Sequence, residues 1–337
     1  MALIDRFLLV TGTMRSGTSL MGELLYPRGA SCGPHPDLIF SNDYTQTLQH
    51  LLKALRAHDP AARAVSPTIT PKLTPAAVAE WRAALGGVDP AALAQLDDRA
   101  AREIVASTMI EEIRRYSSAA PALVAGQKQT QVTTEIDVLA EVFADARSVV
   151  MIRDPRDVIA SHLMRLRTHG YSVAFIESMV AVILNFYEFV ANRQDDRRIK
   201  VVRYEDLTAD VERTLRDVLA FAGLDPDRYD WSGLEGLRSN SSFGTGAGMA
   251  MVDGVGLAPS VGRWRRTLAP RQIELIEAVL RPHMQAHGYE PATEEGQFDR
   301  AELRAFPALC EKILTVDFPY QIEVGPLFRR VGTLCSE

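Results

Sequence analysis

Short apolar runs alternate with helical segments along this 337-residue chain, and the alternation predicts an α/β fold. Residues 7–10, 122–125, 148–152 and 199–203 are mostly apolar and no longer than strands buried on both faces of a sheet. Residues 18–26, which follow the first run closely, have the pattern of a helix and end at a proline. We therefore predict a parallel sheet flanked by helices.

One long interruption separates the first two predicted strands. Residues 42–118 are alanine-rich, with leucines at helical spacing, a helix start at Thr74-Pro75 and an amphipathic helix at 97–116. Four prolines in residues 60–75 indicate a loop between these helices. We predict a single domain over residues 1–337 in which residues 42–118 form a helical insertion. This cap either recognises a substrate or is purely structural.

Apolar residues at helical spacing predict three further helices, at 173–190, 208–223 and 270–287. The first is the most apolar, but it carries Glu177 and Glu188, which favours a core helix over a membrane span. Residues 291–337 form a C-terminal extension whose pattern indicates no role.

The loop after the first strand has the composition of a phosphate-binding loop. Gly12 and Gly17 frame it, and the free N–H groups of the following helix point at it, where the helix dipole favours an anion. The P-loop of nucleotide hydrolases has a lysine directly after its second glycine. Here that position is Thr18, and the cation is Arg15, inside the loop. The chain thus keeps a P-loop-like cradle without the lysine that an ATP-driven kinase needs.

A second basic site follows the strand at 148–152. Arg153 comes directly after the strand, Pro155 fits the first turn of a helix, and Ser161 lies about two turns into it. Ligands of open α/β sheets bind at the carboxyl ends of the strands, where a guanidinium and a hydroxyl can both donate to a phosphate. The alternative is that Arg153 and Arg156 are surface partners of neighbouring aspartates.

The two sites together resemble those of sulfotransferases that use 3′-phosphoadenosine-5′-phosphosulfate (PAPS), in the Arg-Ser-Gly-Thr form of bacterial members. The resemblance covers residues 5–30 and 120–290. It implies a 5′-phosphosulfate loop and a 3′-phosphate pair, followed by weaker matches in the family's order. The implied cofactor-binding residues are Arg15, Ser16, Gly17, Thr18 and Ser19, then Arg153 and Ser161, then Tyr204, Ser241, Phe243, Arg263, Trp264 and Arg265.

The same resemblance implies sulfuryl transfer to a hydroxyl or amine, with Arg15 stabilising the charge on the leaving phosphate and no metal required. Lys128 stands where bacterial relatives show Gly-Glu-Lys-Thr-Pro and is a candidate donor to the transferring group. The glutamate of that stretch is Gln127 here, so its acid–base role does not carry over. For the base that deprotonates the acceptor we expect His35, with Asp37 as the alternative, because tyrosylprotein sulfotransferases have their base in a similar stretch.

Composition agrees with this interpretation without deciding it. A net charge of −6 and a pI near 5.7 argue against a nucleic-acid partner. Three widely spaced cysteines and no visible signal peptide lead us to expect a cytoplasmic protein. A P-loop small-molecule kinase and a non-catalytic nucleotide-binding protein remain the alternatives. The oligomeric state stays open, and a small molecule, glycan, lipid or peptide is compatible as the acceptor.

Overall fold

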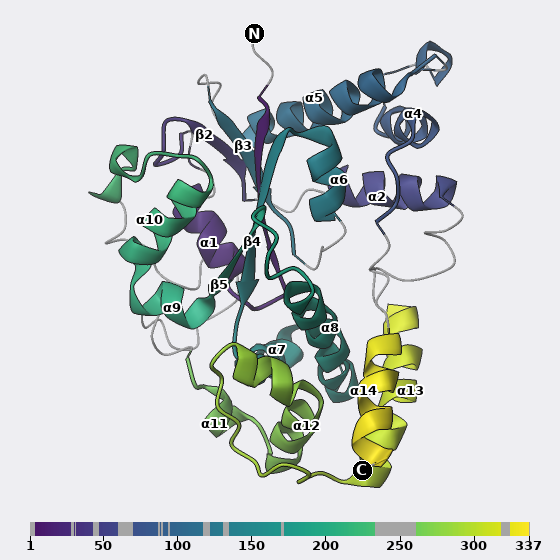
Figure 1. Cartoon of the computed structure of the whole chain (residues 1–337), viewed down its shortest axis with the longest axis vertical. Helices are drawn as coiled ribbons and strands as arrows, with labels where there is room; N and C mark the ends of the chain where they lie inside the picture. The colour runs from purple at the N-terminus through teal and green to yellow at the C-terminus, as the bar shows by residue number, and fades with distance from the viewer. Residues whose placement is uncertain are drawn as a thin grey trace.

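The computed structural model describes residues 4–27, 30, 32–42, 47–59, 70–86, 88, 90–93, 95–116, 122–130, 135–169, 172–232, 261–317 and 324–336. At their centre is a five-stranded sheet of order β2-β3-β1-β4-β5, in which every pairing is parallel (Figure 1). The strands are β1 (Arg6–Gly12), β2 (Leu38–Ser41), β3 (Val124–Lys128), β4 (Asp145–Ile152) and β5 (Ile199–Arg203). The predicted parallel α/β fold is confirmed.

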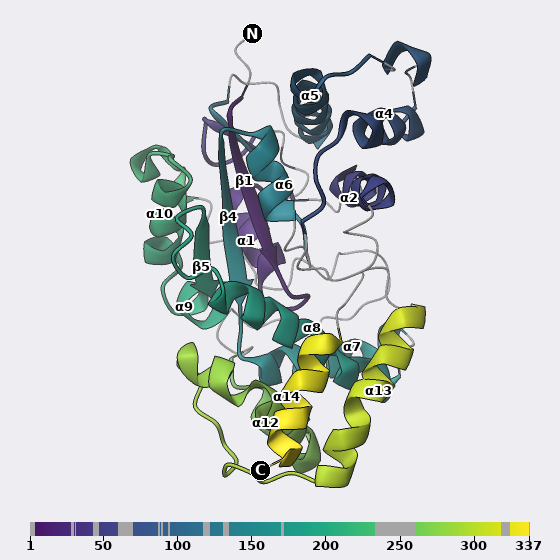
Figure 2. The ribbon, with the colours of Figure 1, turned by 45° about the vertical axis from the view of Figure 1, so that its right-hand side comes forward.

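Helices cover both faces of this sheet and its carboxyl edge (Figures 1 and 2). On one face lie α1 (Thr18–Leu25), α9 (Tyr204–Ala209) and α10 (Val211–Phe221). On the other lie α2 (Thr47–His58), α4 (Pro75–Ala84), α5 (Asp98–Tyr116) and α6 (Glu135–Val142). Beyond the carboxyl edge are α7 (Pro155–His169), α8 (Val173–Ala191), α11 (Trp264–Thr267), α12 (Pro270–Ala286), α13 (Arg300–Asp317) and α14 (Gly325–Ser336). Two short 3₁₀ helices cover Pro90–Leu93 and Pro226–Arg228.

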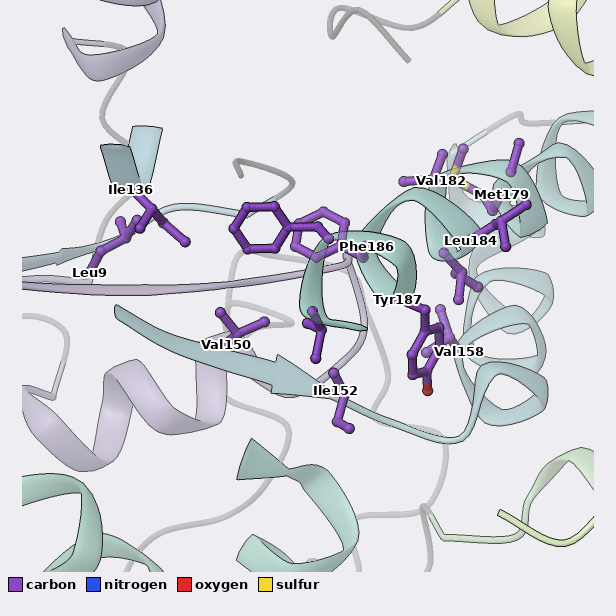
Figure 3. Packing of buried hydrophobic residues seen from close by; sticks show 14 of the residues in the cluster. Leu9, Ile136, Val150, Ile152, Val158, Met179, Val182, Leu184, Phe186 and Tyr187 are labelled. Carbon is purple, nitrogen blue, oxygen red and sulfur yellow. The ribbon is translucent and has the colours of Figure 1, made fainter. Parts of the chain in front are cut away.

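The alternation of side chains along the strands divides the core into two layers. Leu8 and Val10 of β1 pack in the layer of α1 and α10, and Phe7 and Leu9 pack in the larger layer of the opposite face. Figure 3 shows this larger layer, where Leu9 lies beside Ile136 of α6, and Val150 and Ile152 lie on the side of Phe186 and Tyr187 of α8. The pattern explains why both faces of β1 and β4 carry apolar residues.

Helix α8 is the one described helix that is long and apolar enough to cross a membrane, yet 72% of its most apolar window is buried inside the structure. Its neighbours are α7, α12, α13 and α14. Ser172 caps its N-terminus by accepting from the N–H of Phe175 at 3.1 Å. The C-terminal helices α13 and α14, whose role the sequence left open, thus pack against the helix predicted to be in the core.

Some element boundaries differ from the sequence-based expectation. The strand expected at 122–125 is β3 and extends to Lys128, because its register with β1 continues to Val10. The helix expected at 208–223 is divided between α9 and α10. Asp210 has a non-helical backbone there, and its side chain caps α10 by accepting from Arg213 at 3.0 Å. Strand β2, an edge strand of four residues, was not predicted.

A buried arginine joins the end of β4 to α12. Arg156 is 2% exposed and donates from Nη2 to Asp154 and from Nη1 to Glu277, at 2.7 Å each. Glu277 also accepts from the backbone of Ala292 and from Thr293, at 2.6–3.0 Å. Arg156 is therefore not the surface partner that its spacing to Asp154 allowed. Buried charges of this kind stay ionised only when every lone pair and proton finds a partner.

We expect Glu277→Gln to lower the free energy of unfolding by about 1.5–3 kcal/mol, because Arg156 loses one of its two carboxylate partners and keeps only Asp154. Burial by itself would raise the pKa of Glu277. The bonds that Glu277 accepts from Thr293, Ala292 and Arg156 outweigh burial and hold that pKa below its ordinary value of 4.5. The contribution is therefore complete above that value and is lost as the pH falls through the lowered pKa. Urea unfolding from pH 7 to pH 3 measures both effects.

Glu274→Gln is the matched control. Glu274 lies one turn earlier on α12 and accepts only an exposed bond from Gln297 at 3.2 Å. Its replacement should change the free energy of unfolding by no more than about 0.5 kcal/mol. Equal losses for the two variants would show that the buried network contributes nothing particular.

Candidate functional site

The loop between β1 and α1 has the strained geometry of an anion cradle. Gly17 precedes α1 with φ 102°, and a Cβ there would lie 2.5 Å from the ring of Tyr204. Arg15 has φ 73°, the one positive φ of a non-glycine residue in the described ranges. Left-handed backbone at a non-glycine residue is costly and concentrates at functional sites. The N–H groups of Thr18 and Ser19 head the helix that follows.

Ser16 also has a structural role in the loop. Its N–H and its hydroxyl both donate to the carbonyl of Thr13, at 3.2 and 2.7 Å, and its side chain is buried. A Cβ on Gly12 would lie 2.6 Å from the Ser16 hydroxyl oxygen. Ser16 therefore stabilises the turn by hydrogen bonds within the loop. The predicted role of Ser16 in binding a ligand stays a prediction.

The two predicted phosphate sites meet at the carboxyl edge of the sheet. Arg15 donates from Nε to the hydroxyl of Ser161 on α7 at 2.9 Å. Arg153, at the end of β4, donates from Nη1 to the carbonyl of Arg15 at 3.1 Å. Contacts across about 140 residues of sequence thus join the glycine loop to the basic site, as expected where neighbouring parallel strands end.

A third arginine, Arg263, lies more than a hundred residues after Arg153 in the sequence. Burial, and then the cations of Arg153 and Arg266, lower the pKa of Arg263. Arg153 is thus within electrostatic reach of Arg263, whose Nη1 lies 3.2 Å from the sulfur of Met164 on α7. We call Arg15, Arg153 and Arg263 the arginine cluster. Such a concentration of positive charge beside a helix N-terminus favours an anion.

Tyr204 and Glu205, the first two residues of α9, support this cluster. The guanidinium of Arg153 lies 4.3 Å from the centre of the Tyr204 ring, whose edge faces Gly17. Glu205 accepts from the N–H of Asp154 at 3.0 Å and from the Tyr289 hydroxyl at 2.8 Å. The segment therefore fixes the position of Arg153, and Tyr204 contacts both of the predicted phosphate sites.

Residues 262–264, which we call the basic segment, are attached to α7 by one carboxylate. Asp157 accepts from the N–H of Gly262 at 2.6 Å and from the N–H of Trp264 at 2.9 Å. The Trp264 ring is buried, with the guanidinium groups of Arg156 and Arg265 at 4.0 and 4.5 Å from its centre. Trp264 and Arg265 therefore contact each other, and Arg263 is the member of the segment within electrostatic reach of Arg153.

His35, the expected base, lies at the wrong edge of the sheet. It precedes β2, whose Leu38 is in register with Val124 and Arg6 at the amino ends of the strands. The loop follows Gly12, six residues further along β1, about 20 Å away. The Nδ1 of His35 accepts from the N–H of Asp37 at 3.2 Å, so Nε2 donates to the carbonyl of Asp225 at 3.0 Å. The prediction of His35 as the base is wrong.

Asp37, the alternative, lies at the same amino edge and pairs with Arg228. Its carbonyl accepts from the N–H of Val124 at 3.0 Å. The stretch containing both residues therefore joins the starts of β2 and β3. Short motif similarity could not show this, because it did not include the strand β2 that carries the chain past the sheet.

Lys128 lies at the correct edge. It is the last residue of β3, is buried, and is in register with Val10 on the strand that leads into the loop. Gln127 and Gln129 beside it are also buried, and Ser41 of β2 is in register with Gln127. The carboxyl ends of β2 and β3 are therefore lined by buried polar residues, whereas the rest of these strands is mainly apolar. Ser41 and Gln129 were not singled out from the sequence.

Two predicted residues, Ser241 and Phe243, lie outside the described residues. Within the described ranges, no group of three or more His, Cys, Asp or Glu residues is placed to hold a metal ion. Transfer without a metal stays a prediction.

Residues 8–228 match the sequence model of the family described as "Sulfotransferase family". The chain belongs to the sulfotransferase family. The matched range includes the loop, Arg153, Ser161 and Tyr204, and it ends before the basic segment. No curated protein matches this sulfotransferase.

Similar solved structures include the sulfotransferase STF9 from Mycobacterium avium, with a TM-score of 0.43, 16% identity and coverage of 87% of this chain and 79% of that one. A sulfotransferase from Alicyclobacillus acidocaldarius has a TM-score of 0.41 and 17% identity over 67% and 83% of the two chains. Retinol dehydratase with androsterone and the inactive cofactor PAP has a TM-score of 0.40 and 14% identity over 85% and 82%. These likenesses are loose, so the family assignment depends on the sequence match.

We expect His35→Ala to leave sulfuryl transfer within about threefold of wild type, because the imidazole is remote from the loop. The free energy of unfolding should fall by about 1–3 kcal/mol, since the Asp225 carbonyl and the Asp37 N–H lose their partner. Turnover and urea unfolding measured on the same preparation test both statements. A hundredfold loss of turnover in a stably folded variant would restore His35 as the base.

Proposed function

We propose that this sulfotransferase moves a sulfuryl group from PAPS to a hydroxyl or amine of an acceptor. The observation that carries the proposal is the arginine cluster at the carboxyl edge, beside the N-terminus of α1. Its residues come from three separate parts of the sequence, and the charges of Arg153 and Arg263 repel each other. An anion with more than one phosphate relieves that repulsion.

The connection between the sites fits a nucleoside with phosphates at both 3′ and 5′ positions. Both groups are attached to one ribose, so a protein that binds them needs two neighbouring anion sites. Arg15 and the N–H groups of Thr18 and Ser19 supply the 5′ side. Arg153 and Ser161 supply the 3′ side, and the bond from Arg15 to Ser161 supports the assignment of adjacent sites.

The chemistry asked of these residues is mainly electrostatic. Negative charge develops on the phosphate oxygen that leaves, and donors already held in place stabilise it without rearranging. Arg15 is held by its bond to Ser161, and its backbone by the bond from Arg153, so its guanidinium is fixed in advance. We further propose that Lys128 donates to the oxygens of the transferring group from the end of β3.

The kinase alternative is disfavoured by one residue. Thr18 occupies the position where the P-loop lysine would reach the β- and γ-phosphates. A non-catalytic nucleotide-binding protein would share the whole arginine cluster, so only an assay of transfer distinguishes it. Transfer from radiolabelled PAPS to pooled sugar, phenol, lipid and peptide acceptors is the direct test. Nucleotide binding without any transfer would favour the non-catalytic alternative.

We expect Arg15→Ala to lower turnover by roughly 10²–10³-fold, the usual loss when a preorganised donor to developing charge is removed. Arg228→Ala, at the opposite edge of the sheet, removes an equal charge and should leave turnover unchanged. Circular dichroism and urea unfolding check that both variants fold. Unchanged turnover in Arg15→Ala would remove its assigned role.

We expect Arg153→Ala to weaken binding of 3′,5′-bisphosphoadenosine by roughly 10- to 100-fold, the loss of a charge-assisted bond of about 1.5–3 kcal/mol. Binding of AMP, which lacks the 3′-phosphate, should weaken much less. Titration calorimetry with both nucleotides measures the difference. Equal affinity of the wild type for AMP and the bisphosphate would remove the case for a 3′-phosphate site, and preference for ATP with Mg²⁺ would favour a kinase.

A further inference from the structure

We infer that Asp157 is a positioning residue, which holds the basic segment on α7 so that Arg263 stays in the arginine cluster. The inference depends on the proposed nucleotide site, because the role is defined by what Arg263 binds. An acidic side chain repels anions, so Asp157 is not expected beside an anion site. The inference explains why it lies there.

Both carboxylate oxygens of Asp157 accept hydrogen bonds from one short stretch of backbone. Oδ2 accepts from Gly262 at 2.6 Å and Oδ1 accepts from Trp264 at 2.9 Å. The residue between these two donors is Arg263. Its backbone is therefore fixed on both sides, which determines where its guanidinium can reach.

The turn in the basic segment requires a glycine. Gly262 has φ 71°, in the left-handed region, and a Cβ on it would lie 2.7 Å from Nη1 of Arg265. This conformation directs the N–H of Gly262 to the carboxylate. The segment is thus shaped to bind Asp157 rather than packed beside it by chance.

The place of Asp157 on α7 connects this attachment to the nucleotide. Ser161 lies four residues later, so the two side chains are neighbours on one face of the helix. Arg153 is close enough to act on the carboxylate electrostatically. One turn of α7 therefore carries the 3′-phosphate donor Ser161 and the carboxylate that delivers Arg263 to the same place.

Opposing effects act on the carboxylate of Asp157. Burial raises the pKa of Asp157, and Asp154 acts in the same direction, while Arg153 and the N–H groups of Trp264 and Gly262 oppose the shift. A buried carboxylate beside a phosphate site is unfavourable unless donors occupy its oxygens. Here both oxygens face N–H groups of the basic segment, and the negative charge also offsets the repulsion between Arg153 and Arg263.

The test is Asp157→Asn, which keeps the shape and one acceptor oxygen but presents an NH₂ group to a backbone N–H. We expect affinity for 3′,5′-bisphosphoadenosine to fall by roughly 10-fold or more, and affinity for AMP by less than about threefold. The ratio of the two affinities is the decisive readout, because a general loss of stability would lower both together. Calorimetry with each nucleotide on the full chain measures it.

Glu177→Gln is the matched control. Glu177 is also a buried carboxylate, and it ties α8 to the start of α12 by accepting from Arg271 at 3.0 Å and Gln272 at 3.1 Å. We expect its loss to lower the free energy of unfolding while leaving the ratio of nucleotide affinities unchanged. A change of the ratio in Glu177→Gln as large as in Asp157→Asn would overturn the inference.

Gly262→Ala tests the inference without altering α7, should Asp157→Asn fail to fold. Its Cβ strains the turn and displaces the N–H that Asp157 holds, so the ratio of affinities should fall here too. A folded variant of either kind with the wild-type ratio would overturn the role of Asp157. A wild type that does not distinguish the bisphosphate from AMP would instead contradict the proposed function itself, so the two failures are distinguishable.

Discussion

The buried guanidinium of Arg156 is the constraint on which the carboxyl edge of the sheet depends. It is held between Asp154 at the end of β4 and Glu277 of α12, and it contacts the ring of Trp264. Loss of any one member of this buried network is costly, because the remaining buried charges lose a partner. The end of β4, the start of α7, α11 and α12 are therefore fixed relative to one another before any ligand binds.

That fixed frame allows like charges to be held close together. Arg153 and Arg263 repel each other, and the positive φ of Arg15 adds strain. The surrounding bonds to Ser161, Tyr204 and the backbone keep the guanidiniums in place at that cost. A ligand with two phosphates then meets donors that need not rearrange, which is the property that electrostatic catalysis requires.

The error over His35 shows the limit of local similarity. Its stretch resembles one that carries a base in related enzymes, and the residues alone gave no reason to doubt it. What decided the matter was β2, which the sequence did not reveal, and its register with β3. Because that strand begins directly after Asp37, the preceding residues must lie at the amino edge, remote from the loop.

The sequence by itself determined the elements that depend on neighbouring residues: the apolar strands, the glycine loop, the start of α7 at Pro155 and the family. Arg15, Arg153 and Ser161 were predicted because each lies within a few residues of a strand end. Only the tertiary structure decided that Arg156 is buried with Glu277, that Trp264 packs away from solvent and that Asp157 holds the basic segment. These contacts span more than a hundred residues, and such pairings depend on how layers pack, which local patterns do not encode.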